Sequence, residues 1–84
     1  MTNLQIIQSL TTVWLVEHTD SIADEEKEGA IFLTLTSQGV DNATAEELIG
    51  IFRDGSAEDL LREIGVDDDY FVGAMEGFNA TFHR

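Results

Sequence analysis

The sequence predicts an all-α fold, a compact bundle of about four to five short helices. Helix-start signals of the capping-box type recur along the chain, glycines follow stretches of periodic apolar residues, and apolar residues repeat at spacings of three and four. At 84 residues the chain has room for one hydrophobic core, so we expect a single domain over 1–84. The expected helices lie near residues 3–18, 21–37, 44–53, 57–64 and 68–81.

Each of the first four expected starts pairs a hydroxyl residue with an acid or amide three positions later. In this arrangement each side chain satisfies a backbone N–H that the helix leaves unbonded. The pairs are Thr2 with Gln5, Ser21 with Asp24, Thr44 with Glu47, and Ser56 with Asp59.

The expected ends are Gly39, Gly55 and Gly65. Glycine suits the left-handed position after a helix because it has no Cβ to clash there. The sequences at 39–41 and 65–67 are both Gly-Val-Asp. We interpret each as a glycine stop, an apolar residue folded back on the preceding helix, and an acidic start for the next one.

Residues 30–36 allow a second interpretation. The run from Ile31 to Thr36 is rich in β-branched residues and alternates as a strand does. Helix is favoured because no other segment offers a partner strand, and an isolated strand leaves its backbone groups unsatisfied. An α+β fold with a short strand near residues 30–36 remains the alternative.

The predicted core follows the apolar spacing of each helix, because one stripe of an amphipathic helix faces the interior. Its members are Leu4, Ile6, Ile7, Leu10, Val13, Trp14, Phe32, Leu35, Leu48, Ile51, Phe52, Leu60, Leu61, Ile64, Phe71, Met75, Phe78 and Phe82.

The chain is strongly acidic, with 17 Asp and Glu against 4 Lys and Arg, a net charge of −13. This balance argues against direct binding to a phosphate backbone, so we expect no nucleic-acid ligand. Many acids fall in expected first turns, where the helix dipole favours negative charge. The missing bases need another cause, either adaptation to high salt or a positively charged partner.

We expect no membrane segment and a cytoplasmic protein. Residues 1–16 carry no charge, but polar residues interrupt the run and no basic start precedes it.

No pattern predicts catalysis, a metal or a cofactor. The chain has no cysteine, and the acidic run at 67–69 does not fit the calcium-loop spacing because Tyr70 and Val72 occupy ligand positions. We interpret His18, between Glu17 and Asp20, as a surface histidine, and His83 lies beside the end of the chain. The sequence therefore predicts a protein that is not an enzyme.

Two segments resemble known families. Residues 57–78 resemble a helix-turn-helix with Gly65 at the turn, but the second helix opens with three aspartates and contains no base, so it should repel DNA. Residues 39–48 resemble the acyl carrier protein pattern Gly-x-Asp-Ser-Leu. Asn42 stands in place of the serine that carries phosphopantetheine, so the resemblance implies a helical fold without carrier activity.

We expect a small acidic protein-binding module, an inhibitor or modulator that docks on a basic, nucleic-acid-handling protein, with nucleic-acid mimicry as one mode. The alternative is a structural or assembly subunit, a homodimer that uses its uncharged first helix as an interface, with acidity reflecting salt adaptation. A helical carrier or ligand-binding protein is a third hypothesis. The residues expected to bind the partner are Glu25, Glu26, Glu28, Glu46, Glu47, Asp54, Glu58, Asp59, Asp67, Asp68 and Asp69.

Overall fold

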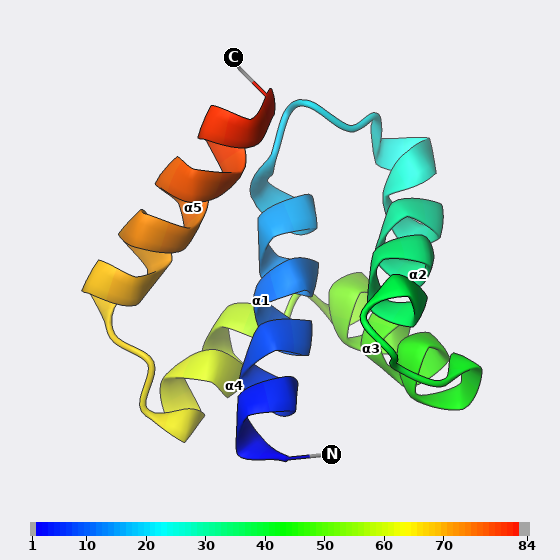
Figure 1. The fold of residues 1–84 in the computed structure, drawn as a ribbon, viewed down its shortest axis with the longest axis horizontal. Helices are drawn as coiled ribbons and strands as arrows, with labels where there is room; N and C mark the ends of the chain where they lie inside the picture. Colours follow the sequence, from blue (N-terminus) through cyan, green and yellow to red (C-terminus); the bar gives the residue numbers. More distant parts are fainter. Residues whose placement is uncertain (1, 83–84) are drawn as a thin grey trace.

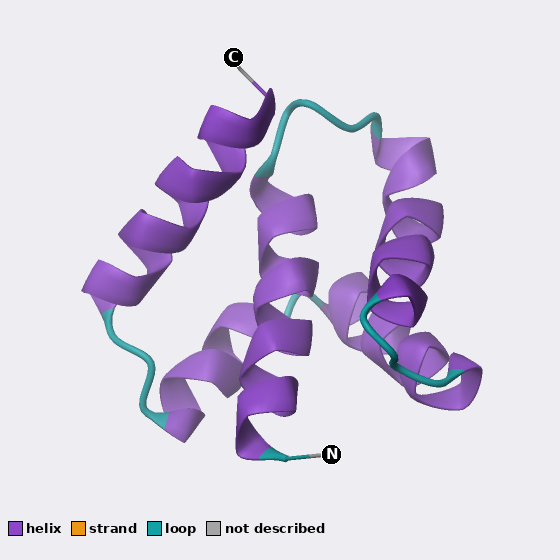
Figure 2. Cartoon of the chain, in the orientation of Figure 1, coloured by secondary structure: helices purple, strands orange, loops and turns teal. Residues whose placement is uncertain are grey.

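Helices account for about four fifths of the residues that the computed structural model describes, 2–82 (Figure 1). No strand occurs in this range, which confirms the all-α prediction (Figure 2). The elements in chain order are α1 (Asn3–His18), the 3₁₀ helix η1 (Asp24–Glu26), α2 (Lys27–Ser37), α3 (Asn42–Asp54), α4 (Ala57–Ile64) and α5 (Asp68–Phe82).

The helix α1, which carries no charge from Asn3 to Val16, is the central helix of the bundle. It packs against α2, α3, α4 and α5, and Figure 1 shows α2 on one side of it and α5 on the other. Seven of its sixteen residues are buried, among them Ser9, Thr11 and Thr12. Burial on several sides explains why this helix lacks the polar face of an ordinary surface helix.

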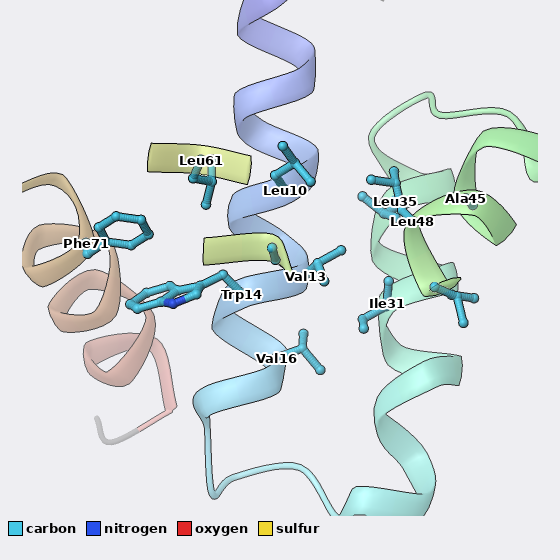
Figure 3. Packing of buried hydrophobic residues seen from close by; sticks show 12 residues of the cluster. Leu10, Val13, Trp14, Val16, Ile31, Leu35, Ala45, Leu48, Leu61 and Phe71 are labelled. Carbon is cyan, nitrogen blue, oxygen red and sulfur yellow. The ribbon is translucent and has the colours of Figure 1, made fainter. Parts of the chain in front are cut away.

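The hydrophobic core forms one cluster around α1. Val13, Ile31 and Leu35 are fully buried and fill the space between α1 and α2 (Figure 3). On the other side of α1, Trp14 points toward Phe71 of α5, with the ring centroids 4.8 Å apart (Figure 3). Most of the predicted core residues belong to this cluster or pack against it. The core also contains residues that the sequence analysis did not predict: Val16, Ile31, Ala45, Ile49 and Ala57.

Two predicted core residues are exposed instead. Leu4 is 64% exposed and Ile64 is 46% exposed. Leu4 lies in the first turn of α1 and Ile64 in the last turn of α4, where the correct spacing is present but neighbouring helices give little cover. The side chain of Phe82, also predicted for the core, lies outside the described residues.

The capping-box prediction is right for α1. The Gln5 N–H donates to Thr2 Oγ1 at 3.2 Å, and the Thr2 N–H donates to Gln5 Oε1 at 2.9 Å. It is wrong for the second helix. The Ser21 N–H donates to Thr19 Oγ1, so Ser21 lies in a turn and does not start a helix. The short helix η1 begins at Asp24, and α2 begins at Lys27.

The capping boxes predicted at Thr44 and Ser56 do not form, whereas the acidic start predicted at Asp41 is confirmed. Asp41, not Thr44, caps α3: its backbone is extended, and its carboxylate accepts the Thr44 N–H. Ser56 occupies the N-cap position of α4, but its φ of −104° and ψ of 6° leave its hydroxyl without a cap bond. An N-cap side chain reaches its target amide from extended backbone, so sequence spacing alone does not identify the cap.

The glycine stops are confirmed. Gly39, Gly55 and Gly65 have φ of 91°, 68° and 110°. The Val40 N–H donates to the Leu35 carbonyl at 3.0 Å, and the Val66 N–H donates to the Leu61 carbonyl at 3.1 Å. These bonds close Schellman-type ends, with both valines packed against the core.

Residues 30–36 are helical, so the strand alternative is wrong. Ile31 and Leu35, one turn apart on α2, are both fully buried. The Thr36 hydroxyl donates to the Phe32 carbonyl at 2.9 Å. Tertiary burial and this local bond override the strand preference of the β-branched residues.

We expect Gly65→Ala to lower the free energy of unfolding by about 1–2 kcal/mol, because a Cβ is strained at its positive φ. Gly73→Ala is the matched control. Gly73 is exposed within α5, and an added Cβ there meets no atom within 4 Å, so alanine should stabilise the helix by about 0.5–1 kcal/mol. Chemical denaturation measures both, and equal effects would contradict the assigned role of Gly65.

Candidate protein-binding surface

The eleven carboxylates predicted to bind a partner do not converge on one patch. Nine are exposed, and Glu28 and Glu58 are half-buried. They lie on η1 and the start of α2, on α3, on α4 and at the start of α5. Figure 1 places η1 and the α4–α5 connection at opposite corners of the molecule, so the eleven carboxylates are spread over its surface.

Each of the three cations within residues 2–82 is already paired. Lys27 Nζ lies 3.3 Å from Asp24 Oδ1 and donates to the Glu17 carbonyl at 3.0 Å. Its side chain is only 10% exposed. This amine ties the start of α2 to the end of α1.

Two arginines form the other pairs. Arg53 binds both carboxylate oxygens of Glu28, at 2.6 and 3.2 Å. Arg62 bridges Asp68 at 2.8 Å and Glu58 at 3.5 Å. The hydrogen bond to Arg53, together with its charge, holds the pKa of Glu28 below its usual range, and the hydrogen bond to Asp68 raises the pKa of Arg62.

These pairs use three of the eleven candidates, Glu28, Glu58 and Asp68. Within the described range the others form no ion pair with a basic side chain and face solvent. These eight, called here the unpaired carboxylates, are Glu25, Glu26, Glu46, Glu47, Asp54, Asp59, Asp67 and Asp69.

Glu58 has a structural role that the sequence analysis did not predict, whereas Asp67 has the role of an acidic helix start that the Gly-Val-Asp pattern predicted. The Trp14 indole N–H donates to Glu58 Oε1 at 3.2 Å, so this carboxylate satisfies a polar atom at the edge of the core. Asp67 Oδ1 accepts the Tyr70 N–H at 3.0 Å and caps α5. The three-residue spacing from Asp67 to Tyr70 is a local cap signal. The Trp14–Glu58 contact joins residues 44 apart, so no local pattern in the sequence predicts it.

Two apolar hollows accompany the acidic surface. The α3–α4 groove, of about 290 Å³, lies over α1 between α3 and α4 and is lined by Ile6, Leu10, Leu48, Ile51, Leu60 and Ile64. The α1–α5 cleft is wider and contains Trp14, Phe71, Val72 and Met75.

The structure places the histidine considered for catalysis beside an aromatic ring. His18 packs its ring against Trp14 at a centroid distance of 5.1 Å, and His83 lies outside the described residues. From Thr2 to Phe82 no group of three or more His, Asp or Glu side chains is placed to hold a metal ion. In the same range no helix combines the length and the apolar character needed to cross a membrane.

The chain matches no protein-family model, and the searches of curated proteins and of solved structures found no match.

We expect Lys27→Met to lower the free energy of unfolding by about 1.5–3 kcal/mol, because the variant loses charge-assisted hydrogen bonds at a buried position. Urea denaturation measures the loss. Arg53→Gln removes a cation from an exposed pair instead and should have a much smaller effect. Equal losses would show that the buried amine has no special role.

The pKa of Glu28 should rise toward 4.5 in the Arg53→Gln variant, while the pKa of Asp41 stays low, since Thr44 and not Arg53 depresses it. Because the folded-state pKa of Glu28 is lowered, its pairing stabilises the fold above about pH 4.5 and is lost as pH falls through the folded-state value. Side-chain carboxyl NMR titrations of the unmodified chain and of the Arg53→Gln variant check this. An unchanged Glu28 titration would contradict the pairing.

Proposed function

We propose that this chain is an acidic protein-binding module that docks on a basic surface of a nucleic-acid-handling protein and acts as an inhibitor or modulator. One observation carries the proposal: every cation within residues 2–82 is paired internally, while eight of the predicted carboxylates are unpaired and exposed. The acidic field is therefore directed to solvent and is available to a cationic partner.

Such a field has two physical effects. It steers a positively charged protein into contact and raises the association rate. It also discriminates against neutral and acidic competitors, since like charges are penalised in a contact. Carboxylates on a rigid helical scaffold would occupy the positions that phosphates take on the partner, so binding should compete with nucleic acid.

The assembly hypothesis has less support. It depended on the uncharged first helix, and burial of α1 against four other helices accounts for that composition. The hypothesis of a carrier or ligand-binding protein needs a cavity or a modifiable side chain, and the acyl carrier position is Asn42, which has no nucleophilic hydroxyl.

We expect the immobilised chain to retain a basic nucleic-acid-binding protein from a lysate of its source at about 0.1 M salt and to lose it at about 1 M, since the Debye length shrinks from about 10 Å to 3 Å. Mass spectrometry identifies the protein. Adding double-stranded DNA to the purified pair should then release it. Retention that is insensitive to salt would contradict the proposal, as would a chain that folds only in molar salt and retains nothing.

Charge reversal tests whether the predicted residues are responsible. Asp59→Lys with Asp69→Lys should weaken retention, and both positions are free of the Arg62 pairs. The control, Asp20→Lys with Glu76→Lys, makes the same charge change at exposed positions outside the candidate set. Equal weakening by both variants would leave only a general charge effect and contradict the assignment of these residues.

A further inference from the structure

The α3–α4 groove is an apolar hollow at the surface of an otherwise acidic protein. Leu10 and Leu48 form its buried floor, and Ile6, Ile51 and Leu60 are half-buried on its sides. Ile64 stands on its edge with 46% of its surface exposed. This residue has the spacing of a core position on α4, one turn after Leu60, yet the fold leaves it uncovered.

The ionisable residues that line the groove have one sign. Glu47 stands on the α3 wall and Glu63 on the α4 wall. Both are exposed, and neither pairs with a basic side chain in the described range. The groove therefore combines an apolar floor with an unneutralised carboxylate on each side.

This combination selects the chemistry of the occupant. A second copy of the chain brings a net charge of −13 and, in the described range, only cations that are already paired, so self-association through the groove brings like charges together. A volume of about 290 Å³ is at the lower end for a small-molecule pocket, roughly 300–1,000 Å³. It suits a few apolar side chains flanked by cations.

We propose that the α3–α4 groove binds a basic amphipathic helix of the partner protein. Aliphatic side chains on one face of that helix enter the groove between α3 and α4. Lysines or arginines beside them lay their stems on the apolar rim and reach Glu47 and Glu63. This inference rests on the proposed function and deepens it, because it adds an apolar anchor to a surface that charge alone would leave unspecific.

The probe is a synthetic Leu/Lys helix of about 18 residues, long enough to be helical, with leucines at amphipathic spacing. Its control has alanine at every leucine and the same net charge. Titrated into the ¹⁵N-labelled full chain, the Leu/Lys peptide should shift the amide signals of the groove residues and bind at least about tenfold more tightly than the alanine peptide. Equal affinities, or shifts centred on the α1–α5 cleft, would overturn the proposal.

Matched variants locate the contact. Ile64→Ser should weaken binding of the Leu/Lys peptide by about tenfold, whereas Leu33→Ser, at a 68% exposed position on α2 outside the groove, should leave it unchanged. Glu47→Gln with Glu63→Gln should weaken it about three- to tenfold, and this loss should vanish at high salt. Circular dichroism verifies that each variant is folded. Equal effects of Ile64→Ser and Leu33→Ser would overturn the proposal.

The lysate experiment separates this proposal from the one on which it rests. If the chain retains a basic protein in a salt-dependent way and Ile64→Ser retains it equally well, the proposed function stands and the groove is wrong. If no basic protein is retained, the proposed function fails, while the peptide titration still reports whether the groove binds a basic helix.

Discussion

The absence of charge from Asn3 to Val16 of α1 is the constraint on which the fold depends. Four helices pack around this one, and a charge on its covered faces would be buried without a partner, at a large cost in free energy. Two of its buried hydroxyls bond within the helix: Thr11 donates to the Ile7 carbonyl at 2.6 Å and Thr12 to the Gln8 carbonyl at 3.1 Å. In the described range no buried side-chain nitrogen or oxygen lacks a partner. Glu17, near the end of α1, is the single acid of this helix, and the other acids lie on the outer helices and in the connections.

Local signals in the sequence predict much of this fold. The helix ends at Gly39, Gly55 and Gly65 follow from the conformational freedom of glycine, and each has a positive φ. Starts are harder to predict because several side chains can cap, and the backbone angle selects among them: Asp41 is extended and caps α3, whereas Ser56 is not extended and makes no cap bond. The exposure of Leu4 and Ile64 depends on where the neighbouring helices end. The apolar spacing within one helix carries no information about those ends.

The candidate surface was predictable in composition and not in arrangement. Counting charges predicts an acidic surface, but it does not predict which carboxylates are neutralised. Arg53 pairs with Glu28 across 25 residues of sequence, because α2 packs on α3. The α3–α4 groove was missed for the same reason, since its walls come from three helices and its carboxylates from two. One feature of the sequence could have indicated the groove: Ile64 is an apolar residue in the last turn of a short helix.

The environment of Lys27 gives the molecule an unusual chemical signature. It is the single lysine of the chain, and its ammonium group is held between the end of α1 and Asp24. A free, deprotonated amine is the nucleophile that reacts with acylating reagents. This side chain should therefore react only when the corner between α1 and α2 opens. The rate of its acylation under native conditions therefore reports the free energy of that local opening. For the same reason, carboxylate-activating crosslinkers suit this protein better than reagents that target lysine.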